Sequence, residues 1–483
     1  MELPQYHSPE VERYANAVFA AIGRKRMEVA SVLNDLSAET IAVAEELEAV
    51  SGTWNPVEMC TPANAMAERN TFIDAYRRGE NYVPRFRYDG ANVIDVDTSR
   101  AALLSLRSRA IALPHEFERD RLARATLFAK IDDDLATCDI AEGLQKGDDR
   151  LSKRGFANKY PGCDEELLAF AEQTYRTYVT DPPAEVPSVL SDEEKKYLRE
   201  RVVTPEEQTE AFTWALKKLG IHREPDEGGD GFAVIVDEDA SMLDVRDKSQ
   251  RGSAVIIPTD RNEDMNAAEL CALIEHEIGA HARQAVNGKR LFKLGGGALR
   301  EDDETLYEGL AMRYEWEFTE RNFGIVREDI DALALYVFAV DLAERGESFH
   351  GIFVDQLERR IRLALKIPTE SLPEPAEMDQ DAYTSCLKRA WRTTYRVMRG
   401  HADVTNTQGF AMAKDLSYLR GWLMDQELVK KGLGYANEAA IMSAKGLQAL
   451  GRVSLAPDDL PVKYQPIGDE YMRMLLAQRP KTA

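Results

Sequence analysis

The stretch LIEHEIGAHARQAVNG, residues 273 to 288, determines how the rest of the chain is interpreted. It contains two histidines, His276 and His281, five positions apart, and Glu277 directly follows the first of them. A common zinc-peptidase signature has the same order of residues, but its histidines are four positions apart. The stretch therefore raises the question of whether both histidines can reach one metal ion.

The geometry of the helix decides that question. Asn266 and Glu269 form an N-terminal capping pair, which predicts a helix that begins here and ends near residues 287–288. On a regular α-helix, positions four apart differ by about 40° around the axis, whereas positions five apart differ by about 140°. The two imidazoles can share an ion only if the helix is widened by one residue, as in a single π-turn. We expect this widening at residues 278–280, where Gly279 tolerates an irregular backbone.

A third ligand is expected downstream, because catalytic zinc takes three protein ligands and keeps one position for water. The stretch LYEGLAMRYEW provides Glu308, 27 positions after His281, and Gly309 next to it lets one helix approach another closely. The sequence thus predicts a Zn2+ site made by His276, His281 and Glu308, with Glu277 as the catalytic base. An alternative stays open, since helical histidines often only pack or cap, and a helical glutamate is usually solvated.

These motifs resemble the microtubule-associated tyrosine carboxypeptidase family, over roughly residues 200 to 425. The matching pieces are HEIGAH, the NG at 287–288, EGLA at 308–311 and AKDLSYLRG at 413–421. The resemblance implies that the two histidines and the EGLA glutamate bind zinc, and that the glutamate after the first histidine is the base. Tyr307 departs from the pattern, since the bacterial relatives have glutamine there in a QEGLA motif. The characterised eukaryotic members of the family remove a C-terminal tyrosine from tubulin. An acidic chain is a poor electrostatic match for the acidic tails of tubulin, so we do not expect tubulin to be the substrate of this protein.

Composition limits the partners of the chain. Its 483 residues include 84 acidic and 61 basic residues, for a formal net charge of −23. Such a surface repels nucleic acids and anionic membranes, so we expect neither as a partner. The N-terminus lacks the pattern of a signal peptide, and the longest apolar run, 332–340, is far too short to span a membrane. Five scattered cysteines without a CxxC motif indicate reduced thiols, so the predicted location is the cytoplasm.

The chain is expected to divide into two regions. Residues 1–180 are predicted to form a helical N-terminal region of unknown role, and the proline-rich segment 181–189 is the candidate linker. Residues 190–483 are predicted to form a zinc metallopeptidase-like catalytic domain. Two runs rich in valine and isoleucine, 231–239 and 252–260, are the only predicted strands. The expected fold is α+β and predominantly helical, with a zincin-like catalytic domain whose small sheet lies next to the HExxxH helix.

A carboxypeptidase needs a cation that binds the terminal carboxylate of its substrate, and arginine suits this best. The candidates are Arg392, Arg396 and Arg399 in WRTTYRVMRG and Lys414 in AKDLSYLRG. Tyr418 is a candidate donor to the developing oxyanion. Arg399, Lys414 and Tyr418 are taken as the predicted substrate-binding residues. The alternatives are a solvated surface position for each arginine and a packed core position for the tyrosine.

Two other stretches bear on access to the site. The strand expected at 252–258 either offers an open edge to an extended peptide or is an ordinary buried strand. The glycine run LGGGALR, residues 294–300, lies between the two ligand helices and is expected to form a mobile rim. It lacks the lysine and the strand-to-helix pattern of a phosphate-binding loop.

Taken together, these patterns predict a zinc metallocarboxypeptidase that hydrolyses a C-terminal residue, with aromatic residues such as tyrosine as candidates, from a peptide or protein. One alternative is an exopeptidase that acts from the amino terminus and also uses five-spaced histidines. Its pocket would need acidic groups for the terminal amine, where a carboxypeptidase needs a cation. The other alternative is a non-catalytic, metal-stabilised interaction protein.

Overall fold

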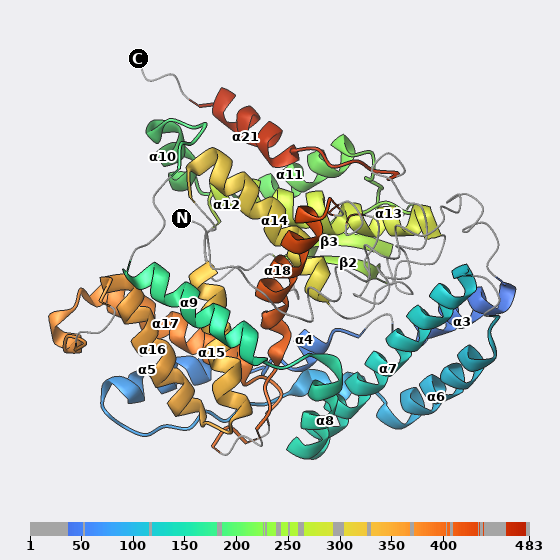
Figure 1. The fold of residues 1–483 in the computed structure, drawn as a ribbon, viewed down its shortest axis with the longest axis horizontal. Helices are drawn as coiled ribbons and strands as arrows, with labels where there is room; N and C mark the ends of the chain where they lie inside the picture. Colours follow the sequence, from blue (N-terminus) through green and yellow to red (C-terminus); the bar gives the residue numbers. More distant parts are fainter. Residues whose placement is uncertain are drawn as a thin grey trace.

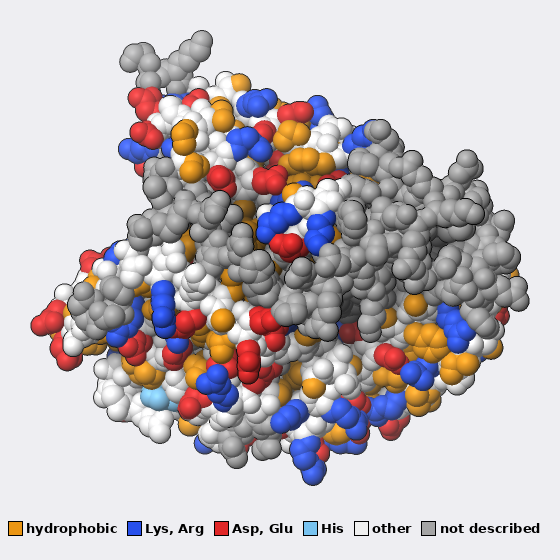
Figure 2. Space-filling model, in the orientation of Figure 1, with side chains coloured by type: hydrophobic (Ala, Val, Ile, Leu, Met, Phe, Trp, Pro, Cys, Tyr) orange, Lys and Arg blue, Asp and Glu red, His pale blue; other side chains and the backbone are white. Residues whose placement is uncertain are grey.

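The architecture is given by a computed structural model, which is α+β and predominantly helical, as predicted. It describes residues 37–479 apart from 52–53, 115–117, 181–185, 226, 228, 238–242, 250–251, 259–264, 293–303, 326–329, 368–370, 402, 406–408, 433, 435–437 and 439–459. The first 36 residues of the expected helical region, the glycine run 294–300 and part of the expected linker lie outside these ranges. Among the described helices, none combines the length and the apolar character needed to cross a membrane. On the face shown in Figure 2, acidic and basic side chains of the described residues are interspersed with apolar ones.

One hydrophobic core joins helices from the N-terminal region to helices from the C-terminal half, and we call it the first core. These elements fill most of the lower half of Figure 1. The N-terminal elements are α3 (Ala38–Ser51), α4 (Pro56–Met59), α5 (Ala65–Arg77), η1 (Asp89–Val93), α6 (Val96–Ala112), α7 (Glu118–Lys146), α8 (Asp149–Lys159) and α9 (Glu165–Thr180). The later elements are α15 (Ile330–Glu344), α16 (Phe349–Leu365), η3 (Pro375–Glu377), α17 (Gln380–Val397), η4 (Ala413–Asp415) and α18 (Leu416–Lys430).

The second core contains the small sheet and the helix that carries the two histidines. Its helical elements are α10 (Asp192–Glu200), α11 (Pro205–Lys218), α12 (Ala267–Leu273), η2 (Ile274–Ala282), α13 (Arg283–Phe292), α14 (Glu304–Phe323) and α21 (Ile467–Ala477). Its strands are β1 (Ala233–Asp237), β2 (Asp244–Ser249) and β3 (Gly252–Pro258). In Figure 1 these elements occupy the upper half of the view.

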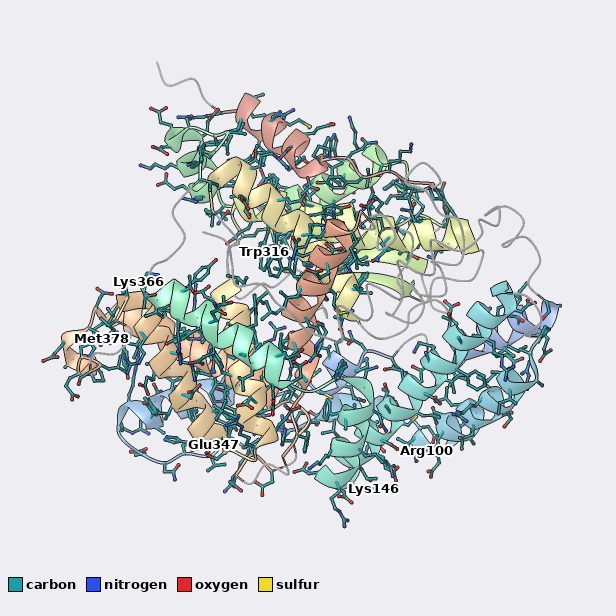
Figure 3. The ribbon with its side chains drawn as sticks, viewed as in Figure 1. Arg100, Lys146, Trp316, Glu347, Lys366 and Met378 are labelled. Carbon is teal, nitrogen blue, oxygen red and sulfur yellow. The ribbon has the colours of Figure 1, made fainter. Side chains whose placement is uncertain are left out.

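Helix α14 belongs to both cores and connects them. Leu306 and Trp316 are buried in the first core, whereas Tyr307 and Phe318 are buried in the second. The ring of Trp316 packs against Trp422 of α18, with centroids 5.2 Å apart, where α14 meets α18 (Figure 3). The contact between α14 and α18 therefore brings a helix of the first core against a ligand-bearing helix of the second.

The sheet has the strand order β1-β3-β2 and lies beside the histidine helix. β1 runs parallel to β3, with Ile235 opposite Ile256, and β2 runs antiparallel to β3, with Val245 opposite Val255. α11 packs on β1 and β3, while β2 contacts η2. The predicted position of a small sheet next to the HExxxH helix is thus confirmed.

The strand predictions were right for two strands and missed the third. β1 and β3 match the expected runs, but β2 has the sequence DVRDKS, whose charges hide the apolar alternation by which strands are recognised. β3 is paired on both sides, so the hypothesis that it offers an open edge is wrong. Residues 253–258 are buried, which makes β3 an ordinary central strand.

The helix that carries the histidines starts at its predicted cap. The backbone N–H of Glu269 donates to Asn266 Oδ1 at 3.0 Å, and the N–H of Asn266 donates to Glu269 Oε2 at 2.9 Å. The predicted end of this helix at residues 287–288 is wrong, because α13 continues to Phe292. The side chain of Asn287 does not end the helix, since it bonds the backbone of Val462 instead.

Candidate metal centre

The helix that carries the two histidines is π-helical from Ile274 to Ala282. The backbone N–H of Arg283 donates to the carbonyl of Ile278, five residues earlier, as a π-turn requires. The widening expected from the spacing of the histidines is therefore present, and it is longer than the single turn at residues 278–280. It brings the rings of His276 and His281 together, with centroids 4.9 Å apart and planes at 82°.

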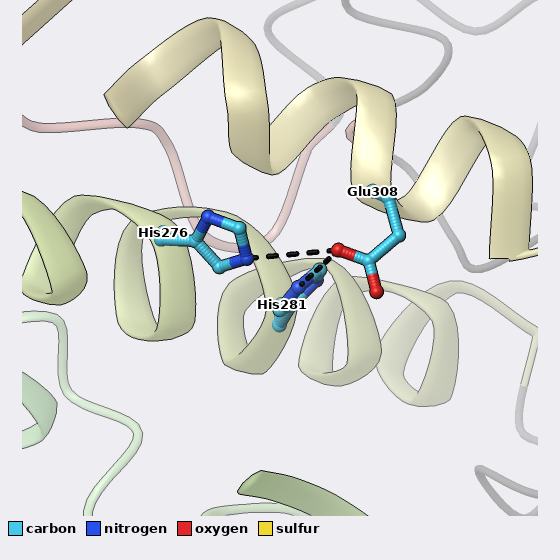
Figure 4. Close-up of side chains that lie close together, drawn as sticks. All are labelled: His276, His281 and Glu308. Carbon is cyan, nitrogen blue, oxygen red and sulfur yellow. Dashed lines mark ion pairs between the residues drawn. The ribbon is translucent and has the colours of Figure 1, made fainter. Parts of the chain in front are cut away.

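Glu308 on α14 points at both histidines (Figure 4). Its Oε2 lies 3.6 Å from Nε2 of His276 and 3.6 Å from Nε2 of His281. One potential ligand atom from each of the three residues lies within 4.8 Å of the others, and all three side chains are at most 11% exposed. The structure thus brings together the three ligands predicted from the sequence.

These residues fit a zinc ion. Tetrahedral zinc with ligands at about 2.0–2.2 Å holds neighbouring ligand atoms about 3.3–3.6 Å apart, which the distances to Glu308 match. Two imidazoles and one carboxylate form the donor set of several catalytic zinc sites, and they leave a position for water. Glu308 Oε2 is buried and has no hydrogen-bond partner among the described residues, which is costly for a carboxylate oxygen unless a cation binds it.

Two further side chains orient the histidines, and neither was predicted to do so. Nδ1 of His276 lies 2.7 Å from Oε2 of Glu315, which leaves Nε2 directed at Glu308. A carboxylate behind a ligating imidazole fixes the ring and raises its basicity. Tyr307 stacks on His281 with centroids 3.6 Å apart and planes at 20°. The signal for Glu315 was in the sequence, because it lies two helical turns after Glu308 and so shares its face of α14.

The carboxylates set the charge state of the centre. Burial alone would raise the pKa of Glu308, but the two histidines and Lys414 hold it well below its usual value. Burial lowers the pKa of His276, yet the carboxylates of Glu308 and Glu315 outweigh this and raise it well above the usual value. The carboxylate of Glu308 is therefore ionised, and a cation that bound here would displace a proton from the imidazole of His276.

Glu277 is half-buried and is not among the three clustered ligands. Its charge contributes to the raised pKa of His276, so it lies near the centre. A catalytic base beside the ion would have this placement.

α18 and the segment before it bring a cation and a phenol to the same carboxylate. Lys414 Nζ lies 3.7 Å from Glu308 Oε1 and 5.2 Å from the ring centroid of Tyr418. The negative charge of Glu308 is the largest cause of the raised pKa of Tyr418, which places this phenol close to the centre. Two of the three predicted substrate-binding residues are thus at the metal centre.

The three candidate arginines differ in their surroundings. Arg392 is exposed on α17, and Arg396 forms an ion pair with buried Asp415, with Nε 2.9 Å from Oδ2. Arg399 is 3% exposed, and its Nε donates to the carbonyl of Arg396 at 3.2 Å. Nη2 of Arg399 has no acceptor among the described residues. Arg399 is therefore the candidate that retains an unsatisfied buried donor.

Comparison with models of known protein families and with curated proteins found no match for this chain.

Proposed function

We propose that the chain is a zinc-dependent metallopeptidase in which His276, His281 and Glu308 hold the ion. The observation that carries this proposal is the convergence of their three ligand atoms within 4.8 Å, where the π-turns of the histidine helix suit the five-residue spacing of His276 and His281. Glu315 behind His276 supports it, because an imidazole that binds a metal commonly donates its other ring N–H to a carboxylate. The resemblance to the tyrosine carboxypeptidase family points to the same chemistry.

In the proposed reaction, water adds to the carbonyl carbon of a peptide bond and the C–N bond breaks. A zinc ion held by His276, His281 and Glu308 would supply a water of lowered pKa and would polarise the carbonyl oxygen. Glu277 accepts a proton from the attacking water and then delivers it to the leaving amine nitrogen. The phenol of Tyr418 stays protonated, since its pKa is raised, and donates to the oxygen on which negative charge develops.

The cation beside the centre, Lys414, favours a carboxypeptidase. Lys414 stands 3.7 Å from Glu308, and Arg399 keeps a buried Nη2 without an acceptor among the described residues. A terminal carboxylate would be attracted by such cations, whereas a terminal amine would be repelled by them. We therefore propose cleavage of the last residue of a peptide or protein, with tyrosine or another aromatic residue as the candidate.

Strand addition at β2 is the proposed way in which the substrate backbone is held. β3 pairs with β1 and β2, so it has no edge to offer, while β2 is one of the two outer strands of the described sheet and contacts η2. An extended peptide that pairs with β2 would gain main-chain hydrogen bonds next to the ligand helix.

A reducing compartment such as the cytoplasm is the proposed location. All five cysteines are free thiols, and four of them are buried. Disulfide bonds are common in oxidising compartments and rare in the cytosol.

The test of this function is hydrolysis of three peptides of one sequence that ends in tyrosine. One has free termini, one has an amidated C-terminus, and one has an acetylated N-terminus. The proposal expects release of tyrosine from the free and acetylated peptides and none from the amidated one. Cleavage that needs a free N-terminus would show an aminopeptidase instead, and cleavage of none by the zinc-loaded protein would favour a binding protein.

A further inference from the structure

Arg283 is a fully buried arginine that the proposed reaction does not use. Its Nε donates to the carbonyl of Gly279 at 2.6 Å, and its Nη2 donates to the hydroxyl of Tyr314 at 2.9 Å. Its Nη1 lies 2.9 Å from Oε2 of Glu438. A buried guanidinium is costly unless its donors are satisfied, so this arrangement requires a reason.

The bonds of Arg283 to its own helix fall on the wide turn between the two histidines. Its backbone N–H bonds the carbonyl of Ile278, and its side chain bonds the carbonyl of the next residue, Gly279. Buried carbonyls need donors, and a π-turn shifts each carbonyl away from the N–H that it would meet in an α-helix. Arg283 thus supplies donors to the two carbonyls of the turn that brings His276 and His281 together.

A segment far along the chain holds Arg283 in place. We call Glu438 and residues 460–464 the C-terminal strap. The guanidinium lies 5.4 Å from the ring centroid of Tyr314 and 5.5 Å from that of Tyr464, and these two rings stack on each other at 4.0 Å. Glu438 provides the charge that pairs with Arg283.

Two other side chains of the helix also bind the C-terminal part of the chain. Asn287 accepts from the N–H of Val462 at 2.7 Å and donates to its carbonyl at 3.1 Å. Glu275 accepts from the hydroxyl of Tyr464 at 3.1 Å and from the N–H of Gly468, in the first turn of α21, at 2.8 Å. The strap and α21 are thus bound to the ligand helix from Glu275 in η2 to Asn287 in α13.

We infer that Arg283 is a positioning residue that holds the wide turn in the shape that binds the metal, and that the C-terminal strap keeps Arg283 there. Without the guanidinium the turn relaxes toward a regular α-helix, in which the two imidazoles diverge. The ion at the centre then depends on contacts made by residues more than 150 positions away, since Glu438 is 155 positions from Arg283. This inference rests on the proposed zinc site.

The test compares zinc dissociation constants, measured by competition with a chelator, for the full-length wild type and Arg283→Met, Arg283→Lys and Glu438→Gln. The matched control is Arg223→Met, which removes another buried arginine, whose guanidinium donates to the carbonyls of Gly231 and Ser253. We expect Arg283→Met to bind zinc at least about tenfold more weakly, as for other residues that orient a metal site. Glu438→Gln should weaken it less, Arg283→Lys should restore part of the loss, and Arg223→Met should match the wild type.

Amide hydrogen exchange of residues 274–283 in the zinc-free proteins gives a second readout. It should be faster in Arg283→Met and Glu438→Gln than in the wild type or the control. The inference is overturned if Arg283→Met and Glu438→Gln bind zinc as tightly as the wild type, or if Arg223→Met loses as much affinity as Arg283→Met. If Arg283→Met does not fold, Glu438→Gln and Tyr464→Phe decide the matter. A wild type that binds no zinc would instead refute the proposed function. Hydrogen exchange of residues 274–283 would still show whether Arg283 stabilises the wide turn.

Discussion

Gly309 of α14 and Gly421 of α18 lie backbone against backbone beside the metal centre. A Cβ on Gly309 would stand 2.2 Å from the carbonyl oxygen of Gly421, and a Cβ on Gly421 would overlap the carbonyl oxygen of Thr305. Gly309 directly follows the ligand Glu308, and the approach of α18 brings Lys414 and Tyr418 to that ligand. The close helix approach that Gly309 was expected to allow is therefore present, and the helix that approaches α14 at this point is α18.

Replacement of Gly421 with alanine should destabilise the protein and disturb the centre, because neither backbone can yield locally. We expect a loss of about 1–3 kcal/mol in the free energy of unfolding, measured with urea. The matched control is Gly351→Ala in α16, where the atoms nearest to the new Cβ belong to the flexible side chain of Glu347. Equal stability of Gly421→Ala and Gly351→Ala would show that the two helices do not touch in this way.

Glu277→Gln should separate metal binding from catalysis. The amide keeps the shape of the side chain but cannot accept the proton of the attacking water, so kcat should fall at least about 100-fold. Zinc content should stay at the wild-type level. The control is Glu320→Gln, which lies in α14 outside the cluster of His276, His281 and Glu308 and should keep full activity. A Glu277→Gln protein with wild-type kcat would refute the assigned role.

Arg399→Leu should weaken binding of peptides that have a free C-terminus. Loss of a buried donor to the terminal carboxylate is expected to raise KM by about tenfold or more. Arg392→Leu is the matched control, since Arg392 lies seven positions earlier and its side chain is exposed. If both variants have the KM of the wild type, Arg399 does not bind the substrate.

His401 should make the protein less stable in mild acid. Burial lowers the pKa of His401 from 6.5 to about 3. Below about pH 6.5, His401 binds a proton in the unfolded chain but stays neutral in the folded protein. The free energy of unfolding therefore falls as the pH drops from about 6.5 toward 3. His401→Phe, which preserves the stacking on Phe410, should lose this part of the pH dependence.

The measurement for His401 is the free energy of unfolding at about pH 7.5 and about pH 5. We expect the difference between the two to shrink by about 2 kcal/mol in His401→Phe. His350→Phe, at a half-buried position of α16, is the control and should behave like the wild type. An unchanged difference in His401→Phe would mean that this histidine is not kept neutral by burial.

Local signals in the sequence predicted the local parts of the structure. The Asn266–Glu269 pair marked the start of the ligand helix, and the five-residue spacing of the histidines required the widened turn that η2 shows. Valine and isoleucine runs marked β1 and β3. Each of these features depends on residues that are close together in the chain.

Contacts between distant segments could not be predicted in this way. Gly309 indicated a close approach but not its partner, because Gly421 is more than a hundred positions away. The strap on Arg283 depends on Glu438 and Tyr464, which have no distinctive pattern in the sequence. β2 is recognisable only through its pairing with β3, since its own residues are mostly charged.

The central claim is that His276, His281 and Glu308 bind one zinc ion, and elemental analysis of the purified protein tests it most directly. The account predicts about one zinc per chain in the wild type and in the control His350→Ala, and almost none in His281→Ala. No zinc in the wild type after zinc has been supplied, or an undiminished zinc content in His281→Ala, would contradict it.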